Sequence, residues 1–150
     1  MGSTVKGLVY VEGNIDSGDC YFSDKIISHS SLEGWVNVGF EKVSQSLEKD
    51  TSNIEYAKSF RKAGPVPIYK SSIDLVKVSN EDTLLNRLVA LNIPVLGIFG
   101  ENNKGMYKSE KRLAQIFPLA FIPYAGHNMM LENPDVFYTE IIKFFKKISS

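Results

Sequence analysis

The sequence has 150 residues, of which 43% are hydrophobic, and this is enough for about one domain with a packed core. Its 17 lysine and arginine residues balance its 17 aspartate and glutamate residues, so the charge does not favour nucleic acid as a partner. The one cysteine, Cys20, excludes an internal disulfide framework, and the apolar run at residues 5–11 contains Lys6 and is soon followed by acidic residues, unlike a signal peptide or a membrane span. We expect a globular, cytoplasmic protein that does not insert into membranes.

The first predicted element is a strand at Leu8–Val11, a short apolar and β-branched run that ends at Glu12. Its composition is typical of a parallel strand that is buried on both faces. A helical pattern then runs from Leu32 to about Gly64, where a linker-like stretch with two prolines, residues 64–67, ends it.

After a brief apolar piece at residues 73–78, the sequence predicts two helix–strand units and a last helix. The acidic start at Ser79 begins a helix that Asn92 can end in a left-handed conformation. Strands that alternate with helices form a parallel sheet, so we expect an α/β fold with about three parallel strands flanked by helices. The elements of this part are a helix at 79–92, a strand at 94–99, a helix at 109–117, a strand at 119–122 and a helix from Asn133.

Polar residues follow all three predicted strands: Glu12 follows the first, Glu101 the second and His127 the third. Because function in parallel sheets gathers at the carboxyl ends of the strands, we expect these residues to converge on one edge of the sheet. A histidine there can act as a general base, with one ring nitrogen oriented by an acid and the other free toward a nucleophile. The alternative is a histidine that only caps a turn.

Two segments of the sequence resemble the α/β-hydrolase superfamily. They are Ile93–Glu101 and the Gly126-His127 pair, which the helix start Asn133-Pro134 follows. The resemblance extends over almost the whole chain. It implies that His127 is the general base of a nucleophile–acid–histidine triad.

The same resemblance implies a single partial α/β-hydrolase domain over residues 1–150, with a small helical cap at about residues 32–78 inserted in the core. Trp35, Phe40 and Phe60 of this cap would shape an apolar pocket for a small-molecule substrate, or they would form the ordinary core of the cap. The first strand would lie at a sheet edge, which invites self-association or pairing with a missing amino-terminal part.

The acid of the triad has two candidates. In most of the superfamily the acid follows the penultimate strand, but the matching turn here, Gly100–Asn103, has Asn103 where an aspartate is expected. Asparagine cannot stabilise an imidazolium as a carboxylate does. Other branches, haloalkane dehalogenases among them, place the acid after the preceding strand, where Glu12 lies. We therefore prefer Glu12 to Glu101, and for both the alternative is a solvated carboxylate in a turn.

The sequence contains no Gly-x-Ser-x-Gly motif, and the superfamily's order places the nucleophile upstream of Met1. Cys20 half imitates such a motif, but it lies too far past its strand and lacks the second glycine. No residues have the spacing of a metal site, and we expect no cofactor. The sequence thus predicts the C-terminal portion of a hydrolase for esters or related substrates, inactive as this chain alone. The alternative is a non-catalytic binding or interaction module on a hydrolase scaffold.

Overall fold

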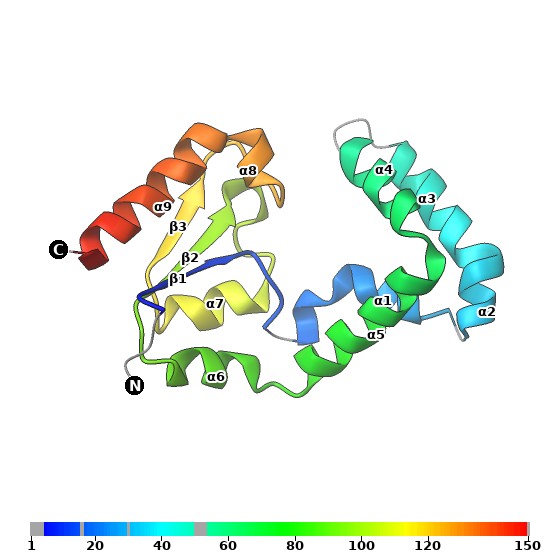
Figure 1. Ribbon diagram of the computed structural model, residues 1–150, viewed down its shortest axis with the longest axis horizontal. Coiled ribbons are helices and arrows are strands. Elements are labelled where there is room, and N and C mark those ends of the chain that lie inside the picture. The colour runs from blue at the N-terminus through cyan, green and yellow to red at the C-terminus, as the bar shows by residue number, and fades with distance from the viewer. Residues whose placement is uncertain (1–4, 16, 30, 50–53, 150) are drawn as a thin grey trace. The chain divides into compact units, whose positions relative to one another are not determined.

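The protein is described by a computed structural model that covers residues 5–15, 17–29, 31–49 and 54–149 (Figure 1). The chain forms two compact units. We call them the sheet unit, which consists of Met1–Asp19 and Asp82–Ser150, and the helical unit, which consists of Cys20–Glu81. Within the described ranges, every helix is too short or too polar to cross a membrane.

Three parallel strands form the centre of the sheet unit: β1 (Leu8–Val11), β2 (Val95–Gly100) and β3 (Leu119–Ile122), in the order β1-β2-β3. These strands, flanked by helices, confirm the predicted fold class. Every residue of β2 is buried, because β2 pairs with a neighbour on each side. The prediction that the first strand is buried on both faces holds in part: Val9 and Val11 pack against one core and Tyr10 against the other, but β1 lies at an edge of the sheet and is only half-buried along its length.

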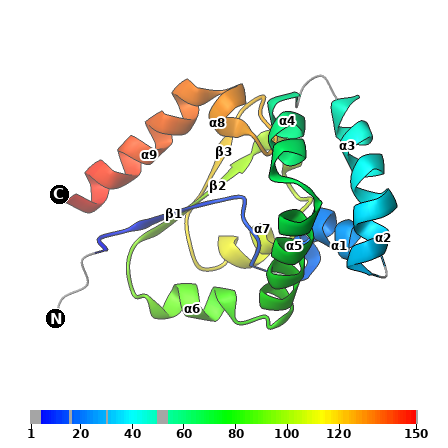
Figure 2. The same cartoon turned by 45° about the vertical axis from the view of Figure 1, so that its right-hand side comes forward.

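Helices cover both faces of the sheet, and Figure 2 shows the two layers. On one face, Phe144 of the last helix and Ile98 belong to one buried cluster, and on the other face Leu113 and Phe99 belong to another. Ile98 and Phe99 are neighbours in β2, so their side chains point to opposite faces. The helices of this unit are α6 (Leu84–Ala90), α7 (Lys108–Ala114), α8 (Met129–Glu132) and α9 (Pro134–Ser149).

The helical unit has an aromatic core. Trp35 is fully buried, and its indole N–H donates a hydrogen bond of 2.8 Å to the carbonyl of Pro65. The ring centroid of Phe60 lies 6.5 Å from that of Trp35 and 5.4 Å from that of Phe40. These three residues therefore pack against one another as a core, the second of the two predicted roles. The helices are α1 (Tyr21–Ile27), α2 (Leu32–Gly34), α3 (Phe40–Glu48), α4 (Ile54–Ala63) and α5 (Pro65–Asn80), with a π-helix at Trp35–Gly39 between α2 and α3.

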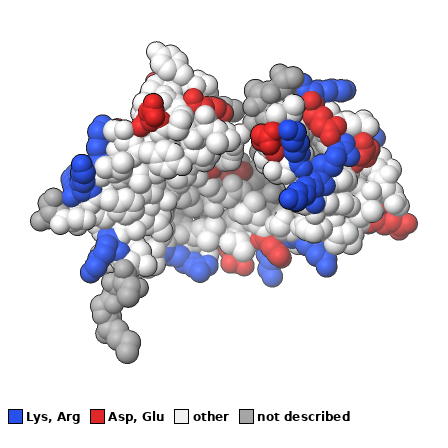
Figure 3. Space-filling model, turned by 45° about the horizontal axis from the view of Figure 1, so that its top comes forward, with Lys and Arg blue, Asp and Glu red and all other residues white. Residues whose placement is uncertain are grey.

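Ion pairs join two helices of this unit. Arg61 of α4 contacts Glu41 at 2.9 Å and Glu48 at 2.6 Å, and both glutamates lie on α3. Basic and acidic side chains are mixed on the face of the molecule that Figure 3 shows. These ion pairs are partly exposed, so we expect them to contribute little to the free energy of unfolding and mainly to orient α3 and α4 relative to each other.

The sequence prediction fails at α5. We expected a linker at residues 64–67 and a short apolar piece at 73–78, but residues 65–80 form one helix. Pro65 and Pro67 lie in its first turn, where N–H groups have no partner within the helix, so the missing N–H of proline removes no bond. Prolines at this spacing are therefore compatible with a helix start as well as with a linker.

The helix predicted to begin at Ser79 begins later. Ser79 belongs to α5, and α6 starts at Leu84 after Asp82, whose φ of 51° breaks the helical path. Asn92 has a φ of 49°, so the predicted left-handed conformation after this helix is confirmed.

Ser44 of α3 provides a test of packing in the helical unit. Its side chain is buried, and its hydroxyl has no hydrogen-bond partner among the described residues. Leaving such a group unsatisfied costs about 1–3 kcal/mol, so Ser44→Ala is expected to raise the free energy of unfolding by about 1 kcal/mol. Urea unfolding followed by the fluorescence of Trp35 measures this.

The control is Ser46→Ala, because Ser46 is exposed on the same helix and gains the same helix propensity from the change. Equal gains for the two variants would show that the buried hydroxyl carries no penalty of its own.

Candidate active site

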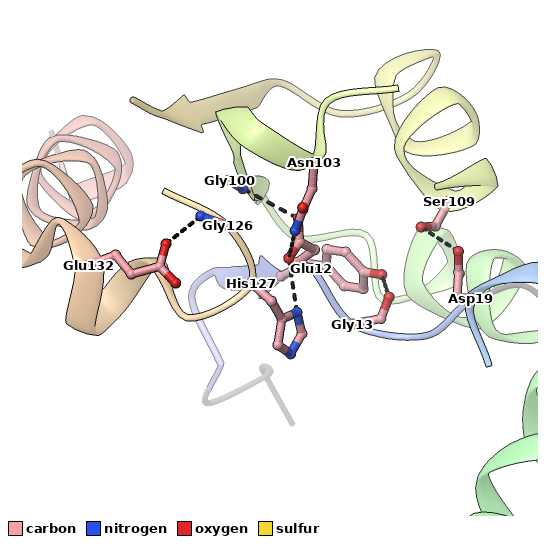
Figure 4. Close-up of polar contacts among 10 residues, drawn as sticks. Glu12, Gly13, Asp19, Gly100, Asn103, Ser109, Gly126, His127 and Glu132 are labelled. Carbon is pink, nitrogen blue, oxygen red and sulfur yellow. Dashed lines mark hydrogen bonds and ion pairs between the residues drawn. The ribbon is translucent and has the colours of Figure 1, made fainter. Parts of the chain in front are cut away.

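The carboxyl ends of the three strands bring Glu12, Asn103 and His127 together (Figure 4). Glu12 follows β1, Asn103 lies in a 3₁₀ turn after β2, and His127 lies in the loop after β3. Glu101 begins the same 3₁₀ turn, but it is exposed and makes no hydrogen bond or ion pair with His127 in the described part of the chain. Of the two candidate acids, Glu12 is the one that contacts the histidine.

Glu12 is buried and has an unusual backbone conformation. Its side chain is 1% exposed, and its φ of 33° lies in the left-handed region that residues with a Cβ atom rarely adopt. Its N–H donates to the carbonyl of Ile98 at 3.0 Å, which continues the ladder between β1 and β2 by one residue. The chain turns at this point, and the Glu12 carboxylate lies between Asn103 and His127 (Figure 4).

Three groups surround this carboxylate. Nδ1 of His127 lies 2.9 Å from Oε2, and Nδ2 of Asn103 donates to Oε1 at 3.2 Å and to Oε2 at 3.1 Å. The N–H of Gly100 donates to Oε1 over a longer 3.4 Å. A buried carboxylate is stable as an ion only with such donors, because an unpaired buried charge is strongly unfavourable. The surroundings of Glu12 are therefore those of an ionised acid.

The loop that carries the histidine is fixed to the turn after β2. The N–H of Asn102 donates to the carbonyl of Ala125 at 3.0 Å. Gly100 lies directly against the same loop: a Cβ atom there would be 2.5 Å from the carbonyl oxygen of Ala125 and closer still to that of Gly126. The approach of these two backbones thus requires glycine at position 100.

Sequence reasoning missed α8 and its role. This helical turn, Met129–Glu132, begins two residues after His127, and the carboxylate of Glu132 accepts a hydrogen bond from the N–H of Gly126. Met129 is fully buried in the core beneath α9. One helical turn is too short to show the 3.6-residue pattern on which helix prediction depends. The bond from Gly126 is visible only in three dimensions.

The histidine is open to solvent and polarised by its acid. Its side chain is 66% exposed. The hydrogen bond with Glu12 raises the pKa of His127, partial burial of the ring opposes this, and the charge of Glu132 adds to the rise. Facing a carboxylate, Nδ1 carries the proton of the neutral ring, and Nε2, which points away from Glu12 in Figure 4, is left as an acceptor. The pair can take up a proton at Nε2 and stabilise the resulting imidazolium.

A second carboxylate fixes the segment that follows β1. Asp19 is buried and accepts hydrogen bonds from the N–H of Ile15 at 3.1 Å and from the hydroxyl of Ser109 at 3.0 Å. Nearby, the hydroxyl of Tyr10 donates to the carbonyl of Gly13, and burial raises the pKa of Tyr10. Asp19 and Ser109 lie to the right of Glu12 in Figure 4, and these contacts fix the chain after the acid.

The other candidate of the sequence, Cys20, is buried and belongs to the helical unit. Among the residues that the structure describes, no three His, Cys, Asp or Glu side chains form a group that could hold a metal ion.

Known proteins resemble this chain in structure. No protein-family model matches it, and no curated protein matches it by sequence. The structure of MenH from S. aureus, an α/β-hydrolase, is similar with a TM-score of 0.68 and 18% identity over 97% of this chain and 60% of MenH. The structure of a thermophilic esterase is similar with a TM-score of 0.54 and 22% identity over 95% of this chain and 57% of the esterase.

The chain thus spans about three fifths of the length of these two proteins. At such identities the likeness concerns the fold. Parallel β1, β2 and β3 with their flanking helices are therefore part of an α/β-hydrolase fold.

Proposed function

We propose that Glu12 and His127 are the acid and the base of a nucleophile–acid–histidine hydrolase whose nucleophile comes from outside these 150 residues. One observation carries the proposal: Nδ1 of an exposed histidine lies 2.9 Å from a buried carboxylate that has further donors. An acid in this position orients the imidazole and stabilises its charged form. Glu101, the other candidate acid, is exposed and makes no hydrogen bond or ion pair with the histidine in the described part of the chain.

The proposed substrate is an ester or a related small compound, in line with the esterase that the chain resembles in fold. As the nucleophile's oxygen attacks the substrate carbonyl, Nε2 of His127 takes up the proton of the nucleophile. Glu12 stabilises the imidazolium through Nδ1–H. The imidazolium then gives the proton to the leaving alkoxide, and water repeats the two steps to release the carboxylic acid.

We also propose that the open edge of β1 pairs with the partner that supplies the nucleophile, either another chain or a preceding segment of a longer product. β1 has one neighbour among the described strands. The N–H groups of Leu8 and Glu12 donate to carbonyls on the side of β2, so those of Val9 and Val11 face the open side. An edge of this kind readily accepts a further strand, and self-association is the other way to cover it.

The test compares this chain with a longer gene product, a protein that also includes the segment encoded immediately upstream of Met1. We call this protein the longer product. We expect the longer product to hydrolyse a chromogenic ester and His127→Ala to lower its kcat/KM by at least about 10³-fold, because the base is lost. This chain alone should show no turnover. His29→Gln is the control, since His29 is the only other histidine and lies in the helical unit.

Hydrolysis by this chain alone that His127→Ala abolishes would contradict the proposal and point to a nucleophile within these residues. A longer product without activity would favour the second candidate, a non-catalytic interaction module. The observation that favours this interaction module is the absence of a Gly-x-Ser-x-Gly motif from these 150 residues. If the upstream segment encodes a strand, a nucleophile turn and a helix, the motif of that turn identifies the class of enzyme. A Gly-x-Ser-x-Gly turn would indicate an esterase, and a Gly-x-Asp-x-Gly turn would indicate a dehalogenase.

A further inference from the structure

We propose that Asn103 is a positioning residue that holds Glu12 as an ionised carboxylate facing His127, and that position 103 must carry a hydrogen-bond donor and not a second acid. The inference rests on the proposed pairing of Glu12 with His127. It assigns a role to the residue that stands where most of the superfamily has its acid. It concerns residues of the sheet unit alone.

The geometry shows what Asn103 does to the carboxylate. Its Nδ2 is nearly equidistant from both oxygens of Glu12, at 3.2 Å and 3.1 Å. Oε2 is shared with Nδ1 of His127, and Oε1 is shared with the N–H of Gly100. A rotation of the carboxylate about its last bond would break contacts with all three groups. Asn103 therefore fixes the direction in which Oε2 presents itself to the histidine.

The turn after β2 holds Asn103 in place through its backbone. The carbonyl of Asn103 accepts from the N–H of Met106 at 3.0 Å, and the carbonyl of Glu101 accepts from the N–H of Lys104 at 3.2 Å. The preceding residue, Asn102, binds the histidine loop through its N–H. The turn after β2 thus fixes the acid, Glu12, through the side chain of Asn103. It fixes the loop of the base, His127, through the N–H of Asn102.

Other residues at position 103 would not do the same. An aspartate would place a second carboxylate about 3 Å from the first, and like charges at that separation are stable only when the pair shares a proton. A leucine would remove one donor from each oxygen of the buried carboxylate and would leave Oε1 with only the longer bond from Gly100. The amide is the side chain of this size that donates without adding charge.

The charge of Glu12 acts on His127, Tyr10 and Tyr107, and the charge of Glu132 acts in turn on His127. Burial and the neighbouring carboxylates raise the pKa of both tyrosines, so neither ionises between about pH 5 and about pH 8. A change in this range that Asn103→Asp introduces therefore reports on the carboxylates and on His127.

The first measurement is the titration of His127 by NMR in the full chain. The sequence has two histidines, so the ring signals of His29 serve as an internal reference, and His127→Gln assigns the peaks. Asn103→Asp is expected to lower the pKa of His127, because the proton that the two carboxylates share neutralises part of the charge that Oε2 presents to Nδ1. Asn102→Asp is the matched control, since Asn102 is exposed in the same turn and adds the same charge. If Asn103 does not position Glu12, the two variants will shift the pKa of His127 by the same amount.

The second measurement is urea unfolding as a function of pH. In Asn103→Asp the folded pair of carboxylates keeps a proton that the unfolded chain has lost, so its stability is full at low pH and falls as pH rises. The ratio of folded to unfolded protein is expected to fall by up to about tenfold per pH unit relative to Asn102→Asp, the slope for one proton. If Asn103→Asp is too unstable to study near neutral pH, the comparison is made near pH 5, where the shared proton is retained.

The double change Glu12→Gln with Asn103→Asp exchanges acceptor and donor and is expected to restore the stability and to remove the pH dependence that Asn103→Asp adds. Parallel pH profiles for Asn103→Asp and Asn102→Asp, or a double variant no better than the sum of its single changes, would overturn the inference. None of these measurements involves ester hydrolysis. Failure here would leave the proposed hydrolase standing, and a lack of hydrolysis would leave the role of Asn103 standing.

Discussion

Replacing Glu12 with glutamine is expected to lower the pKa of His127 toward its ordinary value and to reduce turnover of the longer product by about 10³–10⁴-fold. The hydrogen bond with Glu12 is the main cause of the raised pKa of His127. Glutamine keeps the length of the side chain and removes its charge, so the imidazolium formed during the reaction loses its counter-ion. An amide in place of the triad aspartate lowers turnover of a serine protease about 10⁴-fold, because it holds the imidazole in the wrong tautomer.

The pH dependence follows from the sign of this shift. Because folding raises the pKa of His127, protonation of the ring stabilises the folded chain. This contribution is fully present below about pH 6.5, the ordinary value for histidine, and is lost as pH rises through the raised value. Glu12→Gln should remove most of it, which NMR titration and urea unfolding at several pH values measure. Glu101→Gln is the control, and an equal fall in the pKa of His127 in both variants would contradict the assignment of Glu12.

Changing Gly100 to alanine is the second large effect that we expect. The new Cβ atom would lie 2.2 Å from the carbonyl oxygen of Gly126, so the histidine loop must move away from β2. We expect a loss of about 3 kcal/mol in the free energy of unfolding of the sheet unit, at the upper end for overpacking, because backbone and not a side chain has to shift. His127 should also lose part of its contact with the acid, and its pKa should fall.

Gly97→Ala is the matched control, since both glycines lie in buried β2. The Cβ atom at position 97 would meet Cδ2 of Leu119, the end of a flexible side chain that can turn aside. A loss of about 1 kcal/mol is expected there. Urea unfolding followed by far-ultraviolet circular dichroism compares the two. Similar losses, with the pKa of His127 unchanged in both, would show that the loop does not depend on glycine at position 100.

The strands could be predicted because local signals bound them. β3 lies between Pro118 and Pro123, and β2 is a continuous apolar run that follows a proline and ends at a glycine-containing turn. The start of α5 could not, because Pro65 and Pro67 fit a linker as well as the first turn of a helix. The sequence pattern does not distinguish the π-helix at Trp35–Gly39 from an ordinary helix, since one added residue per turn leaves no distinct apolar period.

The site was predictable in part. That polar residues gather at the carboxyl ends of parallel strands is a property of the fold, and it selected Glu12, Glu101 and His127 as candidates. The contact of Glu12 with His127 depends on the turn that each chain segment makes after its strand. Asn103 is 91 residues from Glu12 in the sequence, and its bond to that carboxylate depends on the same turns. The catalytic role of these residues stays a prediction that the longer product will test.

The backbone conformation and the chemistry favour different residues at position 12, where φ is 33°. Glycine or asparagine would adopt this conformation with less strain, but neither carries a charge, whereas a residue with a longer side chain costs roughly 1–3 kcal/mol there. The carboxylate is therefore kept against the conformational preference of its own backbone. Directed evolution for thermostability alone would drift toward glycine at position 12, and it would discard the acid as it did so.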